Sequence, residues 1–272
     1  MSPRESMSPL NDPASDSTTL HLPRPLCFHG GGANSKIFEV QCRCLEKALR
    51  DTFRLVYVEA PYISYPGPDV VQVYKHMSPF KGWLRWRHED ELRSAPAAVE
   101  RINAAIKLAI DEDDKAGASG DFVGVLGFSQ GAKLAASLLY TQQQLEEVMH
   151  ERSGWPPFRF GILLAGRTPM VWLNADYDMP IGIVDAAAVS TAPTDHLPPM
   201  LDNQKLSVPT LHVHGIQDPG LPLHQKFLHN CCDPSSTTLL EWDGKHRIPF
   251  RHADIDRLVQ GILNLARETC SI

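Results

Sequence analysis

Residues 123–132 read VGVLGFSQGA, and the rest of the chain is organised around them. The stretch begins as a short apolar run, which is typical of a buried parallel strand, and the residues after Gly131 predict a helix. Between the two lies Gly-x-Ser-x-Gly, the pattern of a tight turn that lifts a serine hydroxyl out of a sheet at a helix N-terminus. Ser129 is therefore a candidate nucleophile. The alternative is that Gly127 and Gly131 only let strand and helix pack closely.

Outside this stretch, apolar strands alternate with amphipathic helices. Such alternation predicts an α/β fold, with a mostly parallel sheet, helices on both faces and ligands at the carboxyl ends of the strands. Further strands are expected at 25–29, 53–58, 158–166, 209–215 and 237–242. Helices are expected at 36–49 (capped by Asn34 or Ser35), from Ser94 to a solvated acidic end at 111–114, from Ala132 to about His150, at 221–230 and at 255–267.

Length and composition suit one large domain. The chain has 272 residues and a net charge of −6, which gives no reason to expect nucleic acid as a partner. No apolar run is long enough to span a bilayer. Residues 1–23 are rich in Ser, Pro and Asp, lack the order of a secretory signal and are expected to be a disordered tail before a single domain at 24–272. Six cysteines without a C-x-x-C pair indicate a reducing, cytoplasmic setting rather than a disulfide framework or a metal site.

Two long segments interrupt the alternation. Residues 62–94 are broken by Pro and Gly and contain several aromatic side chains, of which Tyr62, Trp83 and Trp86 are expected to line an apolar acyl pocket. The alternative is an aromatic cluster beneath a surface loop. Residues 167–206 are similarly irregular and are expected to form the second wall of a cleft.

The strand ends deliver a serine, an aspartate and a histidine in that order. Ser129 ends the central strand, Asp218 follows the strand at 209–215, and His246 follows the strand at 237–242. A serine hydroxyl needs a base to accept its proton, and the base needs a partner that holds its tautomer. The order is that of an α/β-hydrolase triad, so we expect the three side chains to converge at one edge of the sheet.

Alternatives exist for the base and for its partner. His224 and His229 fall on a predicted helix, on the outer layer, and His252 starts the terminal helix, which leaves His246 in a glycine-containing loop after a strand. Three other aspartates compete with Asp218. Asp243 is only three residues from His246, and Asp176 and Asp178 follow an earlier strand.

Backbone N–H groups are needed to hold the oxyanion that forms after attack. The residue after the nucleophile, Gln130, is one expected donor, and the His29-Gly30-Gly31 turn supplies the other. Gly31 is favoured over Gly32. A phosphate-cradling loop is disfavoured, because the glycine run lacks both the G-x-G-x-x-G spacing and the P-loop lysine.

Four motifs together resemble the family of serine hydrolases within the α/β-hydrolases, over about Pro25 to Ala266. They are His29-Gly30, residues 127–132 (GFSQGA), His214-Gly215-x-x-Asp218 and Gly244-x-His246-x-x-Pro249. Within that group the chain is most similar to the stand-alone hydrolases of fungal polyketide gene clusters. One departure is Lys245, which stands directly before the histidine where many members have glycine.

The resemblance implies a serine hydrolase that cleaves an acyl thioester or ester, with no cofactor and no metal. Its substrate would be a polyketide chain, carried on an acyl carrier protein. Five cations near the expected entrance suit such an acidic partner: Lys75, Lys81, Arg85, Arg87 and Arg93. Two other functions stay open, a carboxylesterase for small esters and a ligand-binding protein that uses a hydrolase fold without turnover.

Overall fold

The computed structural model describes residues 17–67, 70–191 and 197–272, and one six-stranded sheet runs through them. All of its strands are parallel and lie in the order β10-β9-β6-β5-β1-β2. The strands are β1 (Arg24–Phe28), β2 (Val56–Val58), β5 (Phe122–Phe128), β6 (Phe160–Leu164), β9 (Thr210–Gly215) and β10 (Thr237–Trp242). The predicted parallel α/β class is thus observed.

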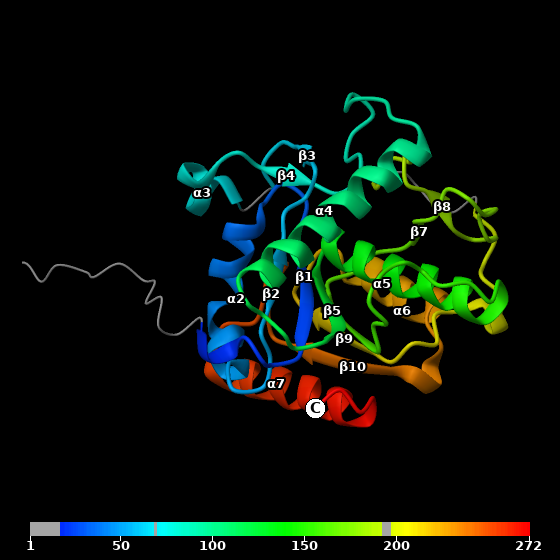
Figure 1. The fold of residues 1–272 in the computed structure, drawn as a ribbon. Helices are drawn as coiled ribbons and strands as arrows, with labels where there is room; N and C mark the ends of the chain where they lie inside the picture. Colours follow the sequence, from blue (N-terminus) through cyan, green and yellow to red (C-terminus); the bar gives the residue numbers. More distant parts are fainter. Residues whose placement is uncertain (1–16, 68–69, 192–196) are drawn as a thin grey trace, which may run out of the picture.

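Helices cover both faces of the sheet (Figure 1). In that view α4 (Ala95–Lys115) and α5 (Gln130–Gln143) cross in front of the strands, while α2 (Ser35–Leu49) lies at the left and α7 (His252–Glu268) runs along the lower edge. Each face has its own apolar core, one built with α4, α5 and α6 (Leu221–Cys231) and the other with α2 and α7. The alternation of side chains along β1 shows the division, since Leu26 and Phe28 belong to the first core and Cys27 to the second.

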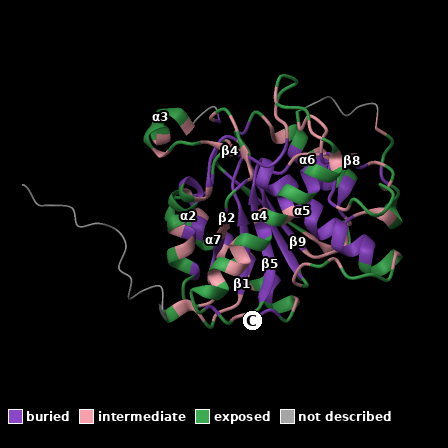
Figure 2. Cartoon of the chain, turned by 45° about the horizontal axis from the view of Figure 1, so that its top comes forward, coloured by how far each residue is buried: buried purple, intermediate pink, exposed green. Residues whose placement is uncertain are grey.

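Helix α5 is buried on every side, although its sequence carries several polar residues (Figure 2). Lys133, Ser137 and Thr141 follow one another at four-residue intervals and therefore share one face of the helix. Each bonds to backbone of the 167–206 segment: Lys133 Nζ donates to Ser190 O at 3.0 Å, Ser137 Oγ accepts from Val171 N–H, and Thr141 Oγ1 accepts from Leu173 N–H. This polar stripe fastens the irregular segment over the helix.

The 62–94 segment is less irregular than its composition suggests. It contains a small antiparallel pair, β3 (Tyr62–Ile63) with β4 (Lys81–Gly82), and the short helix α3 (Val70–Tyr74). Asn34 anchors it, because its amide nitrogen donates to Met77 O at 2.7 Å and to Pro79 O at 3.0 Å. The same side chain accepts from Ile37 N–H and caps α2, so Asn34 is the cap, as one of the two expected residues.

Some element boundaries differ from those expected. The strand expected from residue 53 begins at Val56, because Phe53 and the residues after it pack as an irregular lead-in to β2. Helix α5 ends at Gln143 and continues as a five-residue π-helix, Gln144–Val148. The tail expected over 1–23 falls in part outside the described residues; residues 17–23 include a 3₁₀ turn at Ser17–Thr19, and Ser119 N–H donates to Leu20 O at 2.7 Å.

The acidic run at the end of α4 is not simply solvated, as the sequence pattern predicted. The side chain of Asp113 is only 9% exposed and lies between two arginines, 3.0 Å from Arg24 Nη1 and 2.7 Å from Arg54 Nη2. Arg24 also pairs with Asp114 at 2.6 Å and donates from Nε to Gly120 O. Asp113 and Asp114 therefore link the end of α4 to Arg24 at the start of β1, and Asp113 also pairs with Arg54.

Two further findings concern membrane-spanning helices and disulfide bonds. No helix in the described ranges combines the length and the apolar character needed to cross a membrane. All six cysteines are free thiols, and four of them are buried.

The Asp113 cluster yields a stability prediction. Asp113→Asn should lower the free energy of unfolding by about 3 kcal/mol, because it leaves the two guanidinium groups without their shared buried carboxylate. Asp111→Asn is the matched control, since it breaks only the exposed pair with Lys107 and should cost less than about 0.5 kcal/mol. Urea unfolding of the two variants measures both values; equal costs would contradict the role assigned to Asp113.

Candidate active site

Ser129 lies at the sharp turn between β5 and α5, in a backbone conformation that residues other than glycine rarely adopt. Its φ is 54° and its ψ is −113°. The turn is held on both sides, because Ser129 N–H donates to Leu164 O of β6 and Ser129 O accepts from Lys133 N–H. A Cβ at Gly127 would overlap the carbonyl of Gly131, and a Cβ at Gly131 would overlap the carbonyl of Phe28. Only glycines allow β5, β1 and α5 to meet this closely, so the motif is required for the turn itself.

The structure brings together the three side chains that the sequence analysis selected. His246 Nε2 lies 3.0 Å from Ser129 Oγ, and His246 Nδ1 lies 2.6 Å from Asp218 Oδ2. The three residues come from separate strand ends, 117 and 28 positions apart in the sequence. The imidazole packs against the ring of Phe128, with the ring centroids 4.9 Å apart. A serine, an imidazole and a carboxylate thus form one hydrogen-bonded chain.

Asp218 is set up to remain ionised. It is buried, and burial by itself would raise its pKa. The hydrogen bond and the charge of His246, together with the bond from Gly220 N–H to Asp218 Oδ1 at 2.7 Å, outweigh burial and hold the pKa below its usual value. The rival Asp243 lies elsewhere, where its carboxylate accepts from the side chain of Gln217. A carboxylate that keeps its charge holds the proton on Nδ1 and leaves Nε2 free to accept one.

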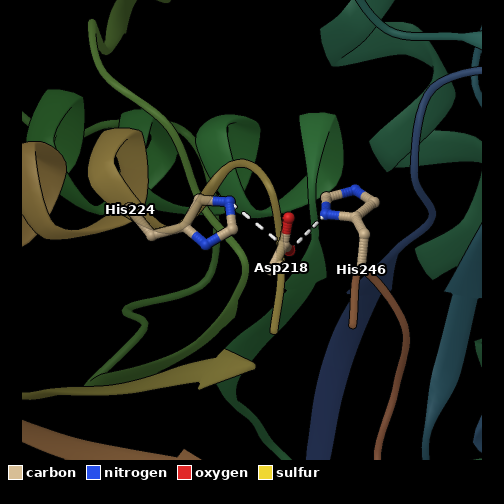
Figure 3. A group of neighbouring side chains, drawn as sticks. All are labelled: Asp218, His224 and His246. Carbon is tan, nitrogen blue, oxygen red and sulfur yellow. Dashed lines mark hydrogen bonds and ion pairs between the residues drawn. The ribbon is translucent and has the colours of Figure 1, made fainter. Parts of the chain in front are cut away.

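His224 does not lie on the outer layer of its helix, as expected. It is fully buried, and its Nε2 lies 3.8 Å from Asp218 Oδ2, so that Asp218 stands between two imidazoles (Figure 3). Burial lowers the pKa of His224 to about 4, so this ring is neutral at neutral pH. The expected position was wrong because α6 turns this face toward β9 and the Asp218 loop. His224 excludes water from the back of the carboxylate without competing for its charge.

The two expected oxyanion donors belong to different elements, Gly31 to the turn after β1 and Gln130 to the first turn of α5. The N–H groups of Gly31 and Gln130 donate to no other group in the described ranges. The turn that carries Gly31 is fixed by His29, whose Nε2 accepts from Ala60 N–H at 3.2 Å and whose Nδ1 donates to Gly30 O at 2.8 Å. Burial lowers the pKa of His29 to about 4, which keeps the ring neutral and able to make both bonds. The turn is thus rigid before any substrate arrives.

The side chain of Gln130 has a separate structural task that the sequence did not reveal. Its Oε1 accepts from Trp83 N–H at 2.8 Å, and its Nε2 donates to Leu84 O at 3.2 Å. These bonds fasten the 62–94 segment directly above the nucleophile turn.

The three aromatic residues expected to line an acyl pocket have different positions. Trp86 lines a small pocket together with Ser129. Trp83 is fully buried, donates from Nε1 to His29 O and packs edge-on against Phe28, so it supports the oxyanion turn and does not face a substrate. Tyr62 does not line this pocket; its ring is stacked beneath the guanidinium of Arg93. The expectation is corrected for Trp83, whose indole is required to fill the core.

The pocket beside Ser129 is lined mostly by residues with polar side chains and has walls from both irregular segments. Its other lining residues are Gln130, Lys133, Arg167, Ser190 and Thr191. The expectation that residues 167–206 form a second wall is therefore confirmed. Lys133 and Arg167 were missed by sequence reasoning. Lys133 could have been noticed in the sequence, because charged residues are rarely buried and this helix is expected to be buried.

Comparison with known proteins finds relatives along nearly the whole chain. A family model described as "Serine hydrolase (FSH1)" matches residues 18–258. Esterase dbaE of Emericella nidulans is 49% identical over 258 residues, covering 92% of this chain and 93% of the relative. Esterase pigG of Monascus ruber is 46% identical over 261 residues, covering 94% and 96%. A solved structure of Est1E from Butyrivibrio proteoclasticus, with ferulic acid bound, shares the fold with a TM-score of 0.51 at 15% identity, covering 94% and 92%.

Buried neutral histidines make the stability of this protein pH-dependent. Burial lowers the pKa of His212 to about 3 and that of His29, His214 and His224 to about 4. The unfolded chain binds these protons near pH 6.5, so the free energy of unfolding should fall as pH drops from about 6.5 to about 4, by up to about 1.4 kcal/mol per pH unit for each histidine.

Denaturant titrations at pH 7, 6 and 5 measure this slope. His212→Leu should flatten it, because one such proton-binding site is removed from the unfolded chain. His252→Leu is the matched control and should leave the slope nearly unchanged at low pH, since His252 is exposed. An unchanged slope in His212→Leu would contradict the account.

Proposed function

Because the chain belongs to the FSH1 family of serine hydrolases and has the α/β-hydrolase fold, we propose that it hydrolyses acyl esters or thioesters through an acyl-enzyme on Ser129. The observation that carries the proposal is the hydrogen-bonded chain from Ser129 Oγ through His246 to Asp218, with distances of 3.0 Å and 2.6 Å. A binding protein without turnover would have no need of all three groups in this order.

The first half of the reaction forms the acyl-enzyme. Ser129 Oγ attacks the acyl carbonyl while His246 Nε2 takes the hydroxyl proton, and Asp218 stabilises the imidazolium that results. The N–H groups of Gly31 and Gln130 donate to the oxygen that becomes negative. The position of Ser129 at the N-terminus of α5 adds a favourable dipole for this charge. Collapse of the intermediate expels the alcohol or thiol, which receives the proton from His246.

The second half returns the enzyme to its starting state. His246 accepts a proton from water, the resulting hydroxide attacks the acyl carbonyl, and the same two N–H groups hold the second oxyanion. His246 then returns the proton to Ser129 Oγ as the carboxylic acid leaves. No cofactor or metal takes part in these steps.

We propose a polyketide chain as the acyl group. Support comes from the similarity of the sequence motifs to stand-alone hydrolases of fungal polyketide gene clusters and from the identity with fungal esterases. The six free thiols favour reducing cytoplasm as the place of action.

Delivery by an acyl carrier protein would require free cations near the entrance of the pocket. Three of the five cations expected to meet such a partner are engaged within this chain: Arg85 donates to Ala187 O and His88 O, Arg87 stacks on Tyr65, and Arg93 stacks on Tyr62. The alternative, an esterase for small esters, is favoured by this observation and by the small size of the pocket beside Ser129.

Removal of the nucleophile tests the chemistry. Ser129→Ala should lower kcat on an aryl ester by at least about 10⁴-fold with the fold retained, and it should abolish labelling by a fluorophosphonate probe. His246→Asn should have a comparable effect on kcat, because the hydroxyl loses its base. His252→Asn is the matched control at an exposed histidine on α7 and should retain full activity. A folded Ser129→Ala protein with an unchanged kcat on the aryl ester would contradict the proposal.

A substrate comparison separates the two substrate classes. If the enzyme releases carrier-bound chains, kcat/KM should be higher for an acyl chain on a carrier protein than for the same acyl chain on N-acetylcysteamine. Equal values for the two thioesters, with a faster rate on the corresponding aryl ester, would favour the small-ester alternative. Mass spectrometry of the acyl-Ser129 adduct identifies the acyl group directly.

A further inference from the structure

Lys133 is a buried lysine beside Ser129, and the described residues provide it with no anionic partner. The residue is 2% exposed and lines the same small pocket as Ser129, one helical turn away. Its ammonium has three donors, and the described residues offer one acceptor, Ser190 O at 3.0 Å. Burial, together with the charge of the nearby Arg167, lowers the pKa of Lys133 to about 7. A side chain without an ionisable group could fasten Ser190 at lower cost, so a lysine at this buried position needs another explanation.

Arg167 is a second cation on the wall of this pocket. It follows β6 and is partly buried, and its guanidinium makes no hydrogen bond or ion pair with any side chain or backbone group in the described ranges. The carboxylate that acts on it electrostatically is Asp218, which is already bonded to His246. Two cations therefore face one small space, and no carboxylate of the described chain is free to neutralise them.

An anionic ligand group would resolve this imbalance. A carboxylate or an enolate oxygen placed between an ammonium and a guanidinium forms charge-assisted hydrogen bonds, which are among the strongest in proteins. The hydroxyl-bearing residues Ser190 and Thr191 also line this pocket and suit the rim of such a site. Because the pocket is small and Ser129 is part of it, the anionic oxygen must lie only a few bonds from the acyl carbonyl.

We propose that Lys133 and Arg167 form a specificity site for an anionic oxygen on the acyl group, so that the enzyme prefers acyl chains carrying a carboxylate or an enolisable 1,3-dicarbonyl close to the scissile bond. This inference rests on the proposed function and narrows its substrate class. It assigns to the two residues a binding role and leaves the bond-breaking steps to Ser129, His246 and Asp218.

Matched esters test the preference. The substrates are the monoaryl ester of glutaric acid, the aryl ester of the neutral monomethyl glutarate, and the aryl ester of a 3,5-dioxo acid. The wild-type enzyme should prefer the glutarate or the dioxo ester over the neutral ester by about tenfold or more in kcat/KM, because charge-assisted bonds contribute that much. The glutarate and dioxo arms distinguish a carboxylate from an enolate as the group recognised.

Charge-removing variants then assign the preference to the two residues. Lys133→Met and Arg167→Gln should each reduce the anionic-to-neutral ratio of kcat/KM about tenfold, mainly through KM. Lys107→Met and Arg43→Gln remove exposed cations elsewhere and should keep the wild-type ratio. If Lys133→Met does not fold, Arg167→Gln carries the test, since its guanidinium makes no hydrogen bond or ion pair with the residues that the structure describes.

Two results would overturn the inference. One is a wild-type ratio near one; the other is an equal loss on neutral and anionic esters in the variants, which would mean that the cations stabilise the oxyanion at the carbonyl or only the fold. Calorimetry with Ser129→Ala measures the affinity for the glutarate ester without turnover. Turnover that fails on every ester, with no probe labelling, refutes the proposed function, whereas binding by Ser129→Ala that is equal for both esters refutes only this inference.

Discussion

The close approach of α5 to the ends of β5 and β1 is the constraint on which the rest of the structure depends. It is possible only because Gly127 and Gly131 leave room for backbone carbonyls where a Cβ would otherwise lie. The approach forces Ser129 to a positive φ and points the start of α5 at the hydroxyl. Strained geometry of this kind persists only where surrounding contacts hold it, and here the bonds of Ser129 to Leu164 O and from Lys133 N–H do so.

Helix α5 connects the nucleophile turn to both segments that cover it. Near its N-terminus the Gln130 side chain holds residues 83 and 84, and along its length the stripe of Lys133, Ser137 and Thr141 holds the 167–206 segment. The two segments also bond to each other, since Ser190 N–H donates to Arg85 O and the Thr191 hydroxyl donates to Trp86 O. The walls of the pocket and Ser129 are therefore parts of one hydrogen-bonded unit. A change in α5 would shift the pocket walls as well as Ser129.

Buried histidines form the electrostatic background of the site. His29 bonds to Gly30 O and Ala60 N–H and so holds the turn that carries Gly31. His224 packs against the buried side of Asp218. Burial lowers the pKa of both to about 4, so each acts as a neutral, shape-filling group. His246 differs from both because its side chain remains 35% exposed and is bonded to a carboxylate. Burial therefore leaves His29 and His224 as neutral supports around the partly exposed His246.

The sequence by itself determined the parallel α/β sheet, the nucleophile turn and the order Ser129, Asp218, His246. These follow from local patterns, namely apolar runs, glycine spacing and the rule that strand ends meet at one edge. Only the tertiary structure decided the position of His224, the burial of Trp83 in the core and the pairing of Asp113 with two arginines, because each depends on groups far away in the sequence. The same holds for the pocket of Lys133 and Arg167. A lysine on a helix is ordinarily a solvated residue, and it becomes a buried charge here only because a distant segment folds over that face of α5.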